Sequence, residues 1–151
     1  MAHKKWYRGA QYTLTAQLPA AGKEFAIEIP EDGPEGVRYE PIAFLAVVSL
    51  SGAVANRNFN FFAENAAHTR YARWGSPNSE VAGATVEFVH FPDADRAILI
   101  NPTRKAQQGS MPRSLYMEKG HRIVSETGLM DAADQWSDVR VLVQEWLFVE
   151  E

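Results

Sequence analysis

The chain has 151 residues, no cysteine and a formal net charge of −4. This length is typical of one domain, and a hydrophobic content of 46% suffices for a core that needs neither disulfide nor metal. The lack of cysteine excludes a disulfide framework and thiol chemistry, and the mild acidity argues against a dedicated nucleic-acid-binding protein.

The first half of the chain shows mainly the two-residue alternation of β-strands. Segments 13–18 and 24–29 both alternate apolar with polar residues, and the turn-like stretch between them predicts a β-hairpin. The continuously apolar run 41–50 predicts a strand buried on both faces, with a short core helix as the alternative. That run is too short to cross a bilayer, so we expect no membrane insertion. Segment 57–63 predicts another strand, and 64–74 fits one or two helical turns.

The second half continues the same pattern. Strands are predicted within 81–91 and at 97–100, and the polar stretch 103–112 predicts a mobile loop. Two short strands are expected at 114–118 and 121–126, and a long one over 138–149. The total of eight or nine strands without a long helix predicts an all-β, single-domain antiparallel β-sandwich. We expect the sandwich to occupy 13–151, after a basic and aromatic arm over 1–12.

No catalytic pattern emerges from the polar residues. The four histidines lack the close spacing of metal ligands: they are His3, His68, His90 and His121. There is no nucleophile elbow, phosphate loop or dinucleotide fingerprint. We therefore predict no catalytic residue, no metal, no cofactor and no enzymatic activity.

Two groups of titratable residues could take part in chemistry, and each has a simpler interpretation. Glu64 and His68 would share one face if their segment were helical, as an ordinary contact four residues apart. Asp131, Asp134 and Asp138 lack the spacing of a calcium loop and are interpreted as solvated loop acids.

The arm combines cations with aromatic rings in its residues Lys4, Lys5, Trp6, Tyr7 and Arg8. Single-strand nucleic-acid-binding proteins use such mixtures. Because the chain has no second basic stripe, packing on a neighbouring subunit or on an acidic surface of the same chain is the favoured interpretation.

A second candidate contact surface lies in the residues Arg70, Tyr71, Arg73 and Trp74. Arginine and aromatic residues are enriched at the centres of protein interfaces. An equally weighted alternative is that the two rings close the end of a sandwich while both arginines are solvated.

The C-terminal third resembles a known group of proteins. Residues 115–123, a polar loop and the closing segment 138–143 are similar to the final strands of small jelly-roll proteins, and in particular to phage cement, decoration and minor capsid proteins. This resemblance implies a jelly roll that forms homo-oligomers and contacts other capsid subunits. It also implies a virion location after synthesis in the host cytoplasm.

Two alternatives remain open. A carbohydrate-binding module would use exposed aromatic residues to bind a glycan, for which the candidates are Tyr71, Trp74 and Trp136. A cupin-like metal enzyme would share the strand content, but this chain lacks the paired histidines of a cupin site.

Overall fold

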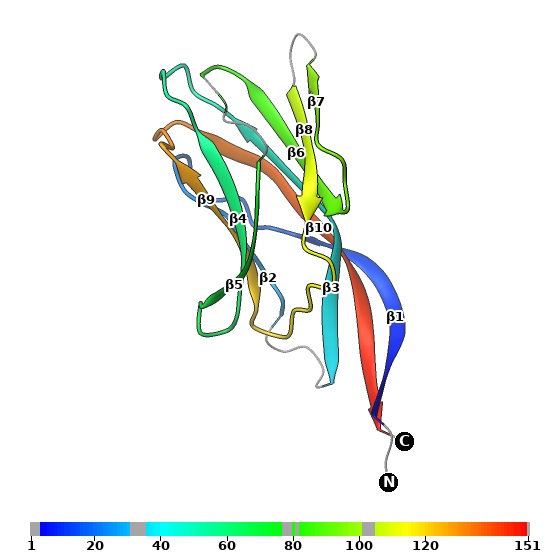
Figure 1. Cartoon of the computed structure of the whole chain (residues 1–151). Coiled ribbons are helices and arrows are strands. Elements are labelled where there is room, and N and C mark those ends of the chain that lie inside the picture. Colours follow the sequence, from blue (N-terminus) through cyan, green and yellow to red (C-terminus); the bar gives the residue numbers. More distant parts are fainter. Residues whose placement is uncertain (1–3, 31–35, 77–79, 81, 101–104, 151) are drawn as a thin grey trace.

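The computed structural model describes residues 4–30, 36–76, 80, 82–100 and 105–150. These residues form ten strands and no helix, one or two strands more than expected (Figure 1). The strands are β1 (Lys4–Thr15), β2 (Ala26–Glu28), β3 (Val37–Ser49), β4 (Asn58–Glu64), β5 (Arg70–Gly75), β6 (Thr85–Pro92), β7 (Ala97–Ile100), β8 (Lys105–Met111), β9 (Arg122–Gly128) and β10 (Gln135–Glu150). The all-β fold is confirmed.

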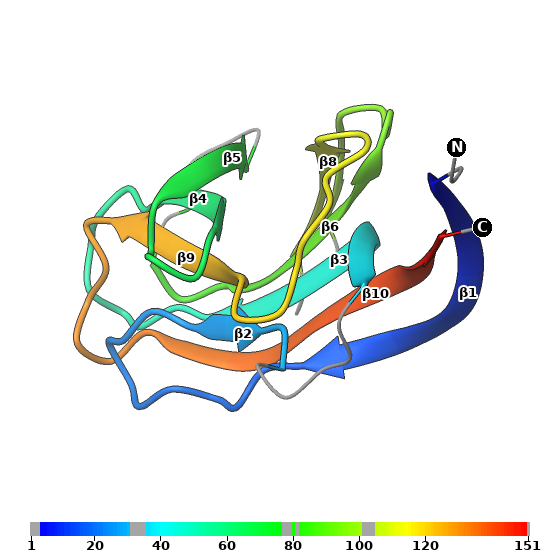
Figure 2. The same ribbon diagram turned by 90° about the horizontal axis from the view of Figure 1, so that it is seen from below.

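The strands form two sheets that pack face to face (Figure 2). Sheet A has six strands in the order β1-β10-β3-β6-β8-β7, and sheet B has four in the order β2-β9-β4-β5. All neighbours are antiparallel except β6 and β8. The chain passes between the sheets from β1 through β4, and β10 and β9 return between the earlier strands. This winding is that of a jelly roll, with β7 and β8 added at one edge.

The predicted hairpin is divided between the two sheets. Residues 13–15 belong to β1, which pairs with β10, whereas β2 pairs with β9. Alternation of apolar and polar residues fixes which side chains point into the core. Two strands in opposite sheets bury their apolar side chains as well as two paired strands of one sheet do, so alternation does not determine which strands pair. The predicted boundary between arm and domain is also wrong. Residues 4–12 are part of β1, and 1–3 lie outside the described residues.

The segment 64–74 contains a turn and a strand where helical turns were predicted. Asn65 Oδ1 accepts hydrogen bonds of 3.0 Å from the backbone N–H groups of Ala67 and Thr69, and His68 has φ 62°. The chain then enters β5. Glu64 therefore does not share a helical face with His68.

Two further expectations fail. Most of the predicted loop 103–112 forms β8, which pairs with β6 and β7, and the buried side chain of Gln107 on this strand hydrogen-bonds to the buried carboxylate of Glu80. Segment 114–118 forms no strand and contributes one bridge, from Met117 to Tyr39.

The core between the sheets is rich in aromatic rings. Trp136 is 0% exposed and meets Phe25 edge to face at 4.8 Å between ring centroids. Phe44 lies 4.8 Å from Phe61, so rings from both sheets interlock. This aromatic layer fixes the spacing of the two sheets.

Sheet A is longer than sheet B at one end. In Figure 1 the lower parts of β1, β10 and β3 extend past the ends of β2, β4, β5 and β9. Residues 4–8 of β1 and 146–150 of β10 pair with each other there, and Val37 and Arg38 of β3 pair with Leu147 and Trp146. We call this part of sheet A the projecting end.

Candidate functional site

One face of the projecting end is a layer of cations and aromatic rings. The Arg38 guanidinium lies 4.0 Å from the ring centroid of Trp6 and 3.7 Å from that of Tyr116. Arg8 lies 5.6 Å from the ring of Trp146, and Trp6 contacts Phe148 at 5.0 Å. Cation–π and ring contacts of this kind stabilise the layer.

The opposite face of the projecting end is apolar and exposed. Tyr7, Leu147 and Val149 alternate with the residues of the cation and aromatic layer, so they point the other way. Their exposed fractions are 38%, 37% and 42%. Lys5 lies on this face, with Nζ 5.9 Å from the Tyr7 ring. Sheet B does not extend far enough to cover this face (Figure 1).

The second predicted patch is divided between core and surface. Trp74 is 4% exposed and packs in the core, so it does not belong to a surface patch. Arg70 lies 3.9 Å from the ring centroid of Phe62 and forms a 2.6 Å ion pair with Glu126. Arg73 donates hydrogen bonds of 3.2 and 2.8 Å to the side-chain oxygen of Asn60 on β4. Both arginines are therefore engaged within sheet B.

Tyr71 keeps a partly exposed position and forms a polar pair with His121. The Tyr71 hydroxyl lies 3.0 Å from His121 Nδ1 and donates a 3.4 Å hydrogen bond to the carbonyl of Tyr116. Burial, with a smaller contribution from Glu118, raises the pKa of Tyr71 to about 12. Burial lowers the pKa of His121 against the opposing effect of Glu118. Because Tyr116 also stacks on Arg38, this pair borders the projecting end.

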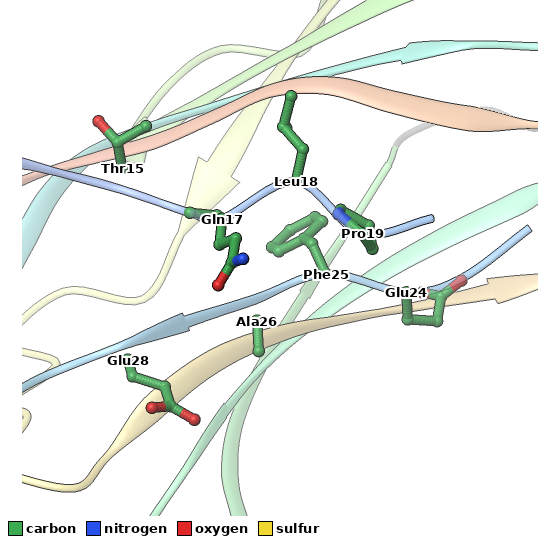
Figure 3. Close-up of a pocket in the computed structure, with 9 residues that line it drawn as sticks. Thr15, Gln17, Leu18, Pro19, Glu24, Phe25, Ala26 and Glu28 are labelled. Atoms are coloured by element: carbon green, nitrogen blue, oxygen red, sulfur yellow. The ribbon is translucent and has the colours of Figure 1, made fainter. Parts of the chain in front are cut away.

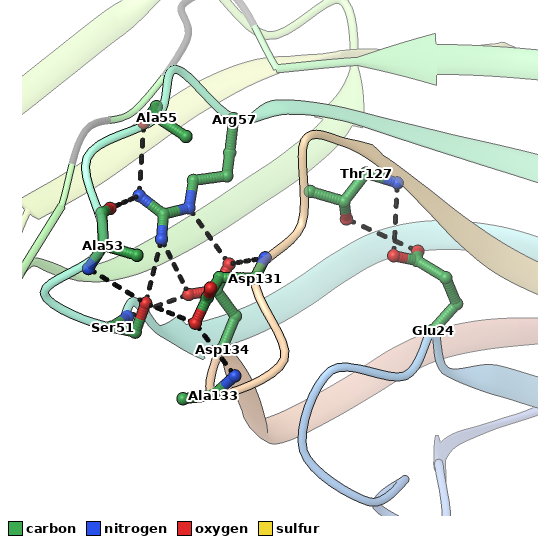
Figure 4. Close-up of polar contacts among 9 residues, drawn as sticks. All are labelled: Glu24, Ser51, Ala53, Ala55, Arg57, Thr127, Asp131, Ala133 and Asp134. Carbon is green, nitrogen blue, oxygen red and sulfur yellow. Dashed lines mark hydrogen bonds and ion pairs between the residues drawn. The ribbon is translucent and has the colours of Figure 1, made fainter.

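A buried ion pair lies at the opposite end of the sandwich and was not predicted (Figure 4). Arg57 is 0% exposed and donates two 3.0 Å hydrogen bonds to the carboxylate of Asp134, which is itself buried. Arg57 also donates to the carbonyls of Ala53 and Ala55 at 2.9 and 3.1 Å. Asp134 is therefore a structural ion-pair partner and not a solvated loop acid.

The neighbouring acids differ in their environments. Burial alone would raise the pKa of Asp134, but hydrogen bonds from Arg57 and from the backbone of Ser51 and Asp131 outweigh it, so the pKa is lowered. Asp131 accepts a 2.8 Å hydrogen bond from the Ser51 hydroxyl and caps the backbone of Ala133 at 3.0 Å. These contacts tie two loops together.

A hollow of about 510 Å³ opens at the edge of the sandwich, between segments 15–19 and 24–28 (Figure 3). These segments overlap the two arms of the predicted hairpin, whose strands β1 and β2 lie in different sheets. Leu18 at its rim is 49% exposed. Glu24 and Glu28 are the charged residues in its lining, and Glu24 is bonded to Thr127.

The alternative functions gain little from this geometry. Trp74 and Trp136, two of the three glycan-binding candidates, are buried in the core. In the described part of the chain no group of three or more histidine, aspartate or glutamate side chains is placed to hold a metal ion. No helix in the same residues is long and apolar enough to cross a membrane.

The chain matches no protein-family model and no curated protein. A solved structure of infectious bursal disease virus, Gt strain, is similar to it with a TM-score of 0.26 and 13% sequence identity. That match covers 91% of this chain and 33% of the viral chain, so this chain spans about a third of the protein it matches. At this TM-score the likeness transfers neither a fold nor a function.

Proposed function

We propose that this protein is a non-enzymatic structural subunit that works by binding other copies of itself and other capsid subunits in a virion. The observation that carries the proposal is the partly exposed apolar face of the projecting end. Tyr7, Leu147 and Val149 are adjacent in the register of β1 and β10, so they form one continuous patch. Contiguous apolar patches rimmed by charge are typical of protein interaction sites.

The interior polar groups favour a structural role over a catalytic one. Arg57 and Asp134 bind each other, buried Glu80 binds Lys105 at 3.0 Å, and Glu64 binds Arg122 at 2.8 Å. A general acid or base needs a proton that it can exchange with a substrate. These charged groups instead spend their hydrogen bonds on holding strands and loops in place.

The choice of a virion as the assembly rests on the resemblance of the C-terminal third to small jelly-roll virion proteins. The strand winding supports it, because β9 and β10 return between earlier strands as the closing strands of a jelly roll do. Attachment to a capsid surface and incorporation in the shell both use exposed sheet surfaces of this kind.

Sedimentation velocity over a range of protein concentrations tests the proposal. We expect the wild-type protein to form oligomers, and the double variant L147S/V149S to shift to monomers. The matched control is L129S, because Leu129 is 69% exposed in a loop away from the projecting end. L129S should sediment like the wild type. A wild-type protein that stays monomeric at every concentration, or a double variant that assembles normally with an unchanged melting temperature, contradicts the proposal.

A further inference from the structure

Among the described residues no strand pairs with the outer edge of β2, so this edge can accept another strand. Ile29 N donates to His121 O, and Phe25 O accepts from Ser125 N, so the odd-numbered residues of this segment face β9. In an antiparallel pair the even-numbered residues between these odd-numbered ones direct their backbone N–H and C=O groups away from β9. Ala26 and Glu28 therefore point their backbone groups outward, and β2 is the last strand of its sheet.

The outer edge of β1 at the projecting end likewise has no partner strand in the part of the chain that the structure describes. Phe148 N donates to Gly36 O, on the β3 side, so Leu147 and Val149 direct their backbone groups toward β1. Their partners Tyr7 and Lys5 face β10. Trp6 and Arg8 consequently direct N–H and C=O to the open edge. A register shift after Arg8 ends this regular edge, and such irregularities limit strand pairing.

The two free edges are complementary in charge and size. Glu24 and Glu28 are four residues apart and carry acids, and Lys4 and Arg8 are four residues apart and carry bases. Because the spacings match, Arg8 lies opposite Glu28 in a parallel strand pair and opposite Glu24 in an antiparallel one. Ala26 lies midway between the two acids and Trp6 midway between the two bases, so the small side chain would face the large one. Opposite charges and a large-small pair are favourable across neighbouring strands.

Strand alternation also gives the exposed Tyr7 a place to bind. If Trp6 of one copy lies opposite Ala26 of another, both point to the outer face of sheet B, and Tyr7 points to the inner face. The inner side of β2 borders the hollow lined by Leu18 and Phe25 (Figure 3). The ring of Tyr7 would enter that hollow, and Leu147 and Val149 would continue the inner face of sheet B.

We propose that residues 4–8 of β1 in one copy add as a strand to the free edge of β2 in a second copy, which joins sheet A of the first to sheet B of the second. This inference rests on the proposed function, since it names the surfaces through which copies bind. The contact joins two different surfaces, so repeated association gives a closed ring or an open chain of subunits. It also covers an edge strand that would otherwise be a template for unspecific pairing.

The strand contact is tested by removing one backbone donor. The variant A26P lacks the N–H that faces the open edge, whereas its matched control A26S keeps it. We expect A26P to raise the dissociation constant of the oligomer about tenfold, which is the effect of losing one interface hydrogen bond. A26S should leave the dissociation constant near the wild-type value. Circular dichroism and melting temperature establish that both variants fold.

Charge reversal and cross-linking test the choice of partners. E28K and R8E should each weaken assembly. In a parallel pairing Arg8 lies opposite Glu28, and a mixture of the two variants should recover assembly; in an antiparallel pairing Arg8 lies opposite Glu24, and the mixture should stay dissociated. Because the chain has no cysteine, W6C and A26C introduce single thiols into a clean background. A mixture of W6C and A26C copies should form a mixed disulfide on oxidation, and a mixture of W6C with L129C should not.

The outcomes separate this inference from the proposed function. If the protein assembles but A26P and E28K dissociate no more readily than the wild type, and no mixed disulfide forms, another surface makes the contact and the inference is overturned. The proposed function then stands. A protein that is monomeric at all concentrations overturns both.

Discussion

Replacing Asp134 by alanine should cost the folded protein about 3–5 kcal/mol, because it leaves a fully buried guanidinium without its counter-charge. The carboxylate accepts four hydrogen bonds, from Arg57 Nε and Nη2 at 3.0 Å each, Ser51 N at 2.8 Å and Asp131 N at 2.9 Å. After truncation Arg57 keeps contacts to the neutral oxygens of Ser51, Ala53 and Ala55. A loss of this size is a large part of the roughly 5–15 kcal/mol by which a typical domain is stable.

The double variant R57M/D134L removes both charges. It therefore separates the energy of the ion pair from the cost of burying each charge. It should cost less than the sum of R57M and D134L, since neither charge is left unpaired. The two backbone N–H groups that Asp134 now caps still lose a partner, at about 1 kcal/mol each. Urea unfolding followed by tryptophan fluorescence gives the four free energies of the cycle. The reasoning would be refuted if the losses of unfolding free energy in R57M and D134L added up to the loss in the double variant, or if D134A were within about 1 kcal/mol of the wild type.

Two further predictions concern the core and a turn. Burial, opposed by backbone contacts from Ser110 and Gly109, lowers the pKa of His90 to about 4. The pKa of histidine in the unfolded chain is near 6.5, so the stabilisation from neutral His90 is complete above pH 6.5 and is lost as the pH falls toward 4. Over this range the free energy of unfolding, measured by urea titration, should fall by about 3 kcal/mol more in the wild type than in H90L. Equal pH dependence of the two free energies would contradict this prediction. Gly22 and Gly83 both have positive φ, but a Cβ on Gly22 would lie 2.8 Å from the Ala132 Cα and one on Gly83 would meet nothing within 4 Å. G22A should therefore lower the melting temperature well beyond G83A, and equal shifts would exclude the clash.

Alternation allowed most strands to be predicted, because it reports which side chains face the core. The run 41–50 lies almost wholly in β3, as predicted for a buried strand, and 57–63 corresponds closely to β4. Pro41, the first residue of the predicted run, lies within β3, at a register shift between Leu142 and Val143 of β10, where an irregular ladder tolerates a missing donor.

Strand neighbours could not be predicted from the same signal. Segments 13–18 and 24–29 alternate equally well whether they pair with each other or with distant strands, so their division between two sheets had no local signature. The ion pair of Arg57 and Asp134 joins residues 77 positions apart. Arg57 begins a predicted strand and Asp134 was interpreted as a solvated loop acid, so neither local pattern indicated the other residue as a partner.

The candidate surface was predicted in part. Trp6, Tyr7 and Arg8 were chosen for their residue types, and they lie together on the projecting end. Their arrangement on two faces of a strand, and the exposure of Leu147 and Val149 beside them, follow from the difference in length between the sheets. That difference depends on tertiary packing, which the pattern of one segment does not report.

The pairing of β1 with β10 has a consequence for how the chain folds during synthesis. Gln11 and Gln144 hydrogen-bond across this pair although 133 residues separate them. The ribosome therefore releases β1 long before β10, with which it pairs, exists, and loop-closure entropy makes so distant a pairing slow. Throughout that interval both edges of β1 are open, and the basic residues near its start are the type that discourages pairing with other nascent chains.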